Sequence, residues 1–162
     1  MKQNKKGFTM VELLLYMSLL TILLIVLTTL FVQILDVRLE SEADSSTSSE
    51  GQFIMSRLAY DIGRADAVLI PTVLGDQTNS LQLTISGINY NYVINSNNLT
   101  LTDAIGTEKL NTTDTRISNL TFTRLGNTSG KNTIRLQYAI TSSVSRISGR
   151  QVENFQTTIG LR

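Results

Sequence analysis

The sequence predicts an α+β protein, in which a long N-terminal α-helix, transmembrane in its first half, packs on a small antiparallel β-sheet domain. An apolar run without a formal charge extends from Leu13 to Leu35, and a helix of that length can cross a bilayer once. Helical periodicity continues farther along, and beyond Pro71 apolar and polar residues alternate as in strands. These patterns divide the chain into an N-terminal apolar helix, a helical extension (36–70) and an antiparallel β-sheet domain (71–162).

The apolar run reads as a membrane span with its N-terminus in the cytoplasm. Lysines precede it and mostly acidic residues follow it, and the positive-inside bias then sends the C-terminal domain outside. A soluble core helix is disfavoured because no polar face recurs at helical spacing. A secretory signal peptide would have a shorter apolar core, about 7–15 residues, and a small-residue cleavage site. The residues before the span that carry this argument are Lys2, Lys5 and Lys6.

Residues 36–70 are expected to prolong the helix. A serine-rich stretch at 44–51 is a candidate weak point, because serine competes locally with the helical backbone. Apolar residues then recur every three or four positions, which predicts one face packed on a sheet. Pro71 is expected to mark the end of the helical region. The periodic residues are Ile54, Leu58, Ile62 and Ala65.

Residues 71–162 carry the alternation of short strands separated by polar turns. This pattern predicts an antiparallel meander with one buried face, covered by the helix around residues 53–67. A loop is expected at Gly126–Asn132 and a last strand from Val152 to Ile159. The apolar residues that alternate with polar ones in these strands are Leu81, Leu83, Ile85, Ile88, Tyr90, Tyr92, Ile94, Leu99, Leu101, Leu120, Phe122, Ile134, Leu136, Tyr138 and Ile140.

Composition removes several classes of function. Cysteine and histidine are absent and the net charge is +1. Disulfides and thiolate metal sites are therefore excluded, and no electrostatic footprint for nucleic acid is visible. No usual nucleophile–base pair exists, although Ser–Lys chemistry stays open. We expect no enzymatic activity, no cofactor and no directly bound nucleic acid.

Three other features favour ordinary structural roles. Asp103, Glu108 and Asp114 share a polar loop, but their spacing matches no calcium loop, so solvated charges are expected. Glycosylation-type triplets arise by chance in a chain this rich in Asn and Thr; they start at Asn98, Asn111, Asn119 and Asn127. Three tyrosines are expected to pack within the sheet, with a ligand platform as the alternative; these are Tyr90, Tyr92 and Tyr138.

Glu12 is the least expected residue of the apolar segment. A charge at mid-bilayer costs on the order of 2.5–3.5 kcal/mol on insertion scales, so a carboxylate there needs a partner. It belongs to the run Gly7-Phe8-Thr9-Met10-Val11-Glu12.

That run resembles the type III prepilin signal of type IV pilins and pseudopilins. The family pattern is a basic leader, a glycine, a methylatable Phe, then Thr-Leu-Val/Ile-Glu and an apolar helix; Met10 replaces the Leu. The resemblance implies that a prepilin peptidase cleaves between Gly7 and Phe8 and N-methylates Phe8, so that residues 1–7 would be the leader and residues 8–35 the transmembrane and assembly helix. Cleavage would give Glu12 a cationic amine as partner, on a neighbouring subunit or, as the alternative, within the same helix at i and i+4.

Two further details concern the type of pilin. Many major pilins carry a glycine and a proline where this chain has Thr21 and Thr29, which favours a minor pilin or pseudopilin. The run Arg57–Ala65 is similar to a stretch in W-type minor pilins and J-type pseudopilins. The alternative is an ordinary amphipathic helix with Arg57 and Asp61 on its wet face.

The predicted function is therefore that of a non-enzymatic, pilin-like structural subunit of a type IV pilus, competence or type II secretion-like filament. Its expected partners are other pilin or pseudopilin subunits, the prepilin peptidase, an inner-membrane assembly platform and the membrane. It would be stored in the cytoplasmic membrane as a single-pass protein and then enter an extracellular or periplasmic filament. The alternative is a membrane-anchored extracellular binding domain, an adhesin or sensor, that does not polymerise.

Overall fold

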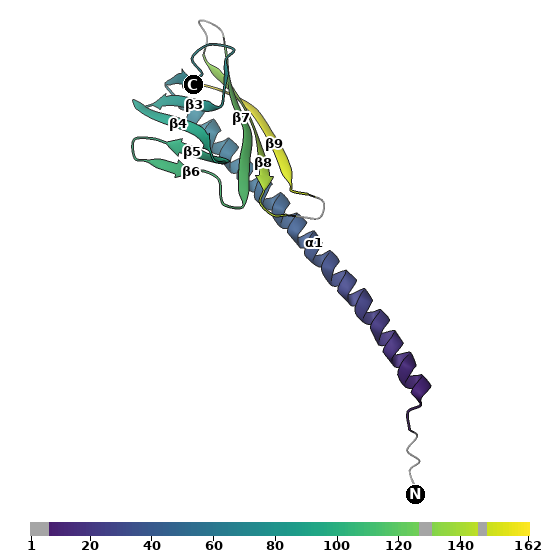
Figure 1. The fold of residues 1–162 in the computed structure, drawn as a ribbon. Helices are drawn as coiled ribbons and strands as arrows, with labels where there is room; N and C mark the ends of the chain where they lie inside the picture. Colours follow the sequence, from purple (N-terminus) through teal and green to yellow (C-terminus); the bar gives the residue numbers. More distant parts are fainter. Residues whose placement is uncertain (1–6, 127–130, 146–148) are drawn as a thin grey trace. The chain divides into compact units, whose positions relative to one another are not determined.

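A computed structural model describes residues 7–126, 131–145 and 149–162 (Figure 1). The predicted leader up to residue 6 and most of the predicted loop at Gly126–Asn132 lie outside this part of the chain. One helix, α1 (Met10–Gly63), precedes all the strands. The chain divides into two compact units, Met1–Leu39 and Glu40–Arg162.

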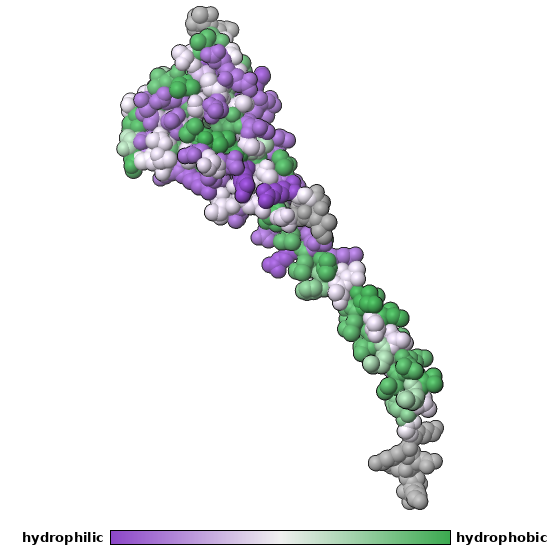
Figure 2. Space-filling model, in the orientation of Figure 1, coloured by the Kyte–Doolittle hydropathy of each residue, from purple (hydrophilic) through white to green (hydrophobic). Residues whose placement is uncertain are grey.

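The first unit contains the apolar part of α1. Every described residue from Gly7 to Leu39 is exposed, and Figure 2 shows hydrophobic side chains over much of this stretch. An 18-residue window of the helix has a mean hydropathy of 2.5 and is 0% buried, so the helix is long and apolar enough to cross a membrane. Its hydroxyl groups donate to backbone carbonyls of the preceding turn, at 2.8–2.9 Å, and so need no other partner in lipid; they belong to Ser18, Thr21, Thr28 and Thr29.

The second unit contains two antiparallel sheets. The five-stranded sheet has the order β1-β3-β4-β5-β6, and the four-stranded sheet has the order β2-β7-β8-β9. The predicted antiparallel pairing is confirmed. The strands form two sheets and not one meander, because β7 pairs with β2 and β8 and not with β6. The strands are β1 (Ala67–Ile70), β2 (Gln77–Thr78), β3 (Ser80–Ile85), β4 (Ile88–Asn95), β5 (Asn98–Thr102), β6 (Thr107–Lys109), β7 (Thr115–Leu125), β8 (Thr133–Ser142) and β9 (Val152–Gly160).

The core lies between these sheets and the end of α1. In β3 and β8 every second residue is buried, as the alternation predicted. Strand β7 has an irregularity between Ser118 and Thr121, where Asn119 adopts a φ of +54°. The extra residue resets the alternation, so that Ile117 and Leu120, three residues apart, are both buried.

The second part of α1 packs on the sheets through one face. Its buried residues are mostly spaced by three and four positions; they are Ala43, Thr47, Gly51, Ile54, Leu58, Asp61 and Ile62. The helix is continuous through residues 44–51, so the serine-rich stretch is not a break in it. The hydroxyls of Ser46 and Thr47 donate to the Ala43 carbonyl at 3.0 and 2.9 Å, which keeps these side chains compatible with the helix.

Small residues on the buried face serve close packing. A Cβ at Gly51 would lie 2.0 Å from the Phe155 ring, and that ring stacks on Tyr138 with 5.2 Å between centroids. The Tyr138 hydroxyl donates to the Gly51 carbonyl at 2.7 Å. Gly51 therefore lets strands β8 and β9 approach the helix backbone.

The helix ends at Gly63. The sequence had predicted that the helical region would continue to residue 70, and this prediction is wrong. Strand pairing explains the difference: Ala67 and Val68 lie opposite Thr84 and Leu83 of β3. The residues that were predicted to extend the helix form β1, the edge strand of the five-stranded sheet. Pro71 follows β1 rather than the helix.

Candidate functional site

The start of α1 carries the residues that the sequence singled out. Thr9 occupies the N-cap position: its Oγ1 accepts the Glu12 backbone N–H at 3.3 Å, and its carbonyl accepts the Leu13 N–H at 3.1 Å. Thr9 and Glu12 thus have the spacing of a capping box, S/T-x-x-E, with a hydrophobic residue just before the cap. Sequence reasoning missed this feature, although a threonine three residues ahead of an acid, before an apolar run, was the signal for it.

Glu12 is exposed and lies in the first turn of α1. A negative charge there is favourable, because the unsatisfied N–H groups give the helix start a partial positive charge. Within the described residues, the Glu12 carboxylate makes no side-chain hydrogen bond and no ion pair. Its predicted partner, an amine on Phe8, does not exist in the uncleaved chain, so their pairing stays a prediction.

Gly7 and Phe8 lie before the helix, outside regular secondary structure. A Cβ at Gly7 would have no atom within 4 Å. The Phe8 ring contacts the Tyr16 ring, with 5.5 Å between centroids and an angle of 44° between the planes. The bond between Gly7 and Phe8 therefore stands clear of the rest of the described chain, while the Phe8 side chain lies along the helix.

The end of α1 holds a second polar cluster, around Asp61. The Asp61 carboxylate accepts from Arg57 Nε at 2.8 Å, from Arg64 Nη2 at 2.7 Å and from the Tyr92 hydroxyl of β4. The Asp61 side chain is 0% exposed, so the interpretation that placed it on a wet face is wrong. The sequence gives no sign of Tyr92 as a partner, because that contact joins residues 31 positions apart.

Burial and the ion cluster shift several pKa values. Burial, followed by the hydrogen bond to Asp61, raises the pKa of Tyr92 well above the ordinary value for tyrosine. The hydrogen bond to Asp61 raises the pKa of Arg57. Burial also raises the pKa of Tyr138, as does the nearby charge of Glu153. Within the described residues, every buried side-chain nitrogen and oxygen has a hydrogen-bond partner. The cluster is therefore a closed structural contact.

The three tyrosines are packed rather than presented as a platform. Tyr92 is fully buried and Tyr138 is nearly so. Tyr90 packs against the core at the side of the sheet, and its ring lies 5.5 Å from the guanidinium carbon of Arg64.

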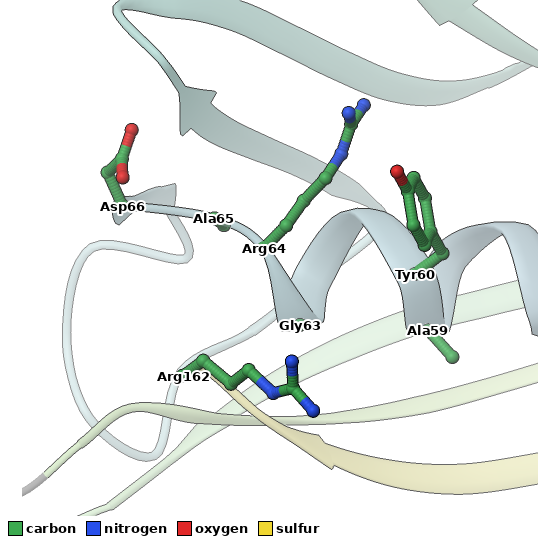
Figure 3. Close-up of a pocket in the computed structure, with 7 residues that line it drawn as sticks. All are labelled: Ala59, Tyr60, Gly63, Arg64, Ala65, Asp66 and Arg162. Carbon is green, nitrogen blue, oxygen red and sulfur yellow. The ribbon is translucent and has the colours of Figure 1, made fainter.

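A hollow of about 610 Å³ lies at the end of α1. In Figure 3, Tyr60 and Arg64 point to one side of the helix end and Arg162 lies on the other side. The polar groups therefore do not converge on one point, as they would in a ligand site. The lining residues are Ala59, Tyr60, Gly63, Arg64, Ala65, Asp66 and Arg162.

The loop acids and the glycosylation triplets can also be placed. No group of three or more acidic residues with metal-binding geometry exists in the described part of the chain. Asp103 instead accepts the backbone N–H groups of Ile105 and Gly106 at 2.8 and 3.1 Å. Asn111 is buried, and its amide nitrogen donates to the Thr115 carbonyl at 3.0 Å, so that triplet is not accessible. The triplet at Asn127 lies outside the described residues.

Glu50 links α1 to the turn that precedes β7. Its carboxylate accepts from the Thr112 backbone N–H, from the Thr112 hydroxyl at 3.1 Å and from the Thr115 hydroxyl at 2.6 Å. Together with the buried Asn111, it fixes the connection between the two sheets. Sequence reasoning missed the role of Glu50, which sits in no recognisable pattern, and it noted Asn111 only as the start of a glycosylation-type triplet.

Comparison with known proteins finds similarity only at the N-terminus. A model of the family described as the prokaryotic N-terminal methylation motif matches residues 2–28. Neither the curated proteins nor the solved structures contain a match to the chain. The motif supports a type IV pilin-like protein, processed by a prepilin peptidase and assembled with other pilin subunits. Proteins with this motif are structural rather than catalytic, and the motif together with the apolar helix indicates membrane anchoring.

Proposed function

We propose that this chain is a minor pilin or pseudopilin, a structural subunit of a type IV pilus, competence or type II secretion-like filament. The observation that carries the proposal is the methylation motif at residues 2–28, continued directly by an exposed apolar helix. Thr21 and Thr29 stand where many major pilins have glycine and proline, which favours a minor role. A domain that stays tethered and never polymerises would have no use for the motif.

In this proposal a prepilin peptidase hydrolyses the peptide bond between Gly7 and Phe8. Water supplies a hydroxyl group to the Gly7 carbonyl carbon and a proton to the Phe8 nitrogen. The new amine then takes a methyl group from a sulfonium-type methyl donor, which leaves as the thioether, and the amine nitrogen loses one proton. Two features support this site. The bond precedes the N-cap, so helix hydrogen bonds do not have to be broken, and the missing side chain of Gly7 lets a protease approach the backbone closely.

In this proposal Glu12 has one role before cleavage and another after it. In the uncleaved chain it offsets the positive helix start beside Thr9. After cleavage it pairs with the Phe8 amine of a neighbouring subunit. At 4 Å and an effective dielectric constant of 20, such a pair attracts by about 4 kcal/mol. Desolvation offsets much of this, so the pair sets the register between subunits more than it adds stability.

Assembly transfers the apolar half of α1 from lipid to contacts with other pilin helices. Lipid is as apolar as leucine, so packing and polar pairing drive this transfer rather than exclusion of water. Before assembly the chain crosses the cytoplasmic membrane once, with residues 1–7 inside and the β-sheet domain outside. An inner-membrane assembly platform would extract it into the extracellular or periplasmic filament.

The test is incorporation into filaments sheared from the native host. We expect Glu12→Ala to be cleaved but depleted at least severalfold in the filament fraction, because the amine loses its partner. Asp36→Ala is the matched control: it removes another exposed acid of the same unit and should be incorporated normally. A wild-type chain that is absent from every filament fraction, and remains a membrane-tethered domain, would contradict the proposal.

A further inference from the structure

The contact between Phe8 and Tyr16 joins the residue before the N-cap to the second turn of α1. Both side chains are largely exposed, at 67% and 51% of their surface, so no other side chain of the described part forces the two rings together. The 5.5 Å separation and 44° tilt fall in the range that favours aromatic pairs. The contact is therefore a local clasp between the two rings.

The clasp holds a residue that lies outside the helix. The helix begins at Met10, and Thr9 fixes the direction in which the chain enters it. Phe8 lies just outside, where its backbone has no helical hydrogen bonds to hold it. Packing an apolar ring against the helix gains little hydrophobic free energy in lipid, because the surrounding lipid is equally apolar. The ring contact is thus the specific interaction that orients Phe8.

Glu12 lies on the same side of the helix start. Glu12 and Tyr16 are four residues apart, and residues at that spacing are neighbours on a helix surface. Phe8 lies four residues before Glu12, ahead of the helix start, and its ring contacts the Tyr16 ring. While the Phe8 ring lies against Tyr16, a Cβ added to Gly7 would meet no described atom within 4 Å, so the side of Gly7 that a peptidase would approach is open.

We propose that Tyr16 is a positioning residue for peptidase processing at Gly7 and Phe8. The inference rests on the proposed function, because it concerns the same cleavage. Tyr16 draws the Phe8 ring along the helix and thereby presents the bond between Gly7 and Phe8 to the peptidase. The contact needs the ring of Tyr16 and not its hydroxyl group.

The test measures cleavage of the full-length precursor in detergent or nanodiscs by a purified prepilin peptidase. Tyr16→Leu removes the ring and should lower kcat/KM by about two- to tenfold, the range set by the strength of an aromatic pair. Tyr16→Phe keeps the ring and should be cleaved within about twofold of wild type. The double variant Leu15→Tyr/Tyr16→Leu has the same composition but moves the ring to another face, so it should behave like Tyr16→Leu.

A double-mutant cycle with Phe8→Leu separates the clasp from a general effect on the helix. Once Phe8 has lost its ring, Tyr16→Leu should cause no further loss of rate. Nuclear Overhauser contacts between the two rings should appear in the wild-type precursor and vanish in the swapped variant. These contacts are measured without the peptidase. They report the ring pair itself, whereas a general effect of Tyr16 on the stability of the helix would not require the two rings to touch.

The outcomes separate this inference from the proposed function. If the peptidase does not cut the wild-type precursor, the proposed function fails and the inference fails with it. If wild type is cut and Tyr16→Leu is cut as fast or faster, only the inference is overturned. It is also overturned if the effect of Tyr16→Leu persists undiminished in the Phe8→Leu background.

Discussion

The two parts of α1 are one continuous helix with two different surfaces. Between Met10 and Leu39 every residue is exposed, and leucine, isoleucine and valine occupy all sides. Between Glu40 and Gly63 one face is buried against the sheets of its own domain, and most of the remaining residues are polar, although Phe53 and Tyr60 are exposed. Helical propensity is therefore shared by both parts, whereas the partner of each surface differs. The second part has its partner in the same chain, and the first part needs one from lipid or from other chains.

The largest contrast should come from the same substitution placed in each part. Leu58 is fully buried, and Leu58→Ala should lower the free energy of unfolding of the β-sheet domain by about 2–5 kcal/mol. Leu23 is 52% exposed, and Leu23→Ala should leave that value unchanged. Denaturant unfolding of the full-length protein in detergent, followed by near-ultraviolet circular dichroism, measures both. Equal losses would show that the two surfaces do not differ as described.

The buried acid of the second part should matter next. Asp61→Ala leaves the buried Tyr92 hydroxyl without its acceptor and removes the partner of two arginines. We expect a loss of about 3 kcal/mol, the lower end for breaking a buried charge pair, because both arginines can turn toward water. Asp44→Ala, an exposed acid on the same helix, should change stability by less than about 0.5 kcal/mol. A neutral effect of Asp61→Ala would contradict the cluster's role in joining α1 to β4.

Two glycines test how tightly the second part packs. Gly51→Ala places a Cβ against the Phe155 ring, which then has to leave its stack on Tyr138. The expected cost is about 1–3 kcal/mol from overpacking. Gly63→Ala meets no atom within 4 Å and should be neutral or slightly stabilising. Thermal unfolding of the two variants provides the comparison, and a neutral Gly51→Ala would show that the sheet does not lie this close to the helix.

Alkaline pH should weaken the β-sheet domain and leave the apolar part of the helix unaffected. Burial raises the pKa of Tyr92 and Tyr138 in the folded protein. The unfolded chain loses these protons near pH 10 and the folded chain keeps them, so the full stability is present below about pH 10. Above that, the free energy of unfolding should fall by about 1.4 kcal/mol per pH unit for each tyrosine.

Unfolding curves at a series of pH values check this expectation. Tyr92→Phe should reduce the slope above pH 10, because one of the two titrating groups is gone. Tyr60→Phe is a suitable control, since Tyr60 is 64% exposed. If the free energy of unfolding of the wild type stayed constant up to about pH 11, the expected contribution of the two buried, neutral tyrosines would be contradicted.

The sequence predicted those parts of the molecule that depend on local patterns. The alternation in β3 and β8 identified their buried residues, and the uninterrupted apolar run identified the exposed part of α1. The end of the helix was misplaced, because pairing of Ala67 and Val68 with β3 outweighs local preference. The division into two sheets also depends on pairing between distant strands, which periodicity does not report.

The candidate site shows the same limit. Gly7, Phe8 and Glu12 were singled out because their order along the chain carries the signal; the family motif covers them, and their individual roles stay predictions. The Thr9 cap was readable and was overlooked. Tyr16, Tyr92 and Glu50 have no signature of their own, because their roles come from contacts with residues that only the folded chain brings near.

The claim that underlies this account is that the apolar start of α1 becomes a free, methylated helix end. The direct measurement is the intact mass and N-terminal sequence of the protein purified from its native host. We expect a chain that begins at Phe8 and carries one added methyl group. A chain that still begins at Met1, with unmodified Phe8, would contradict it and leave a domain that is only tethered to the membrane.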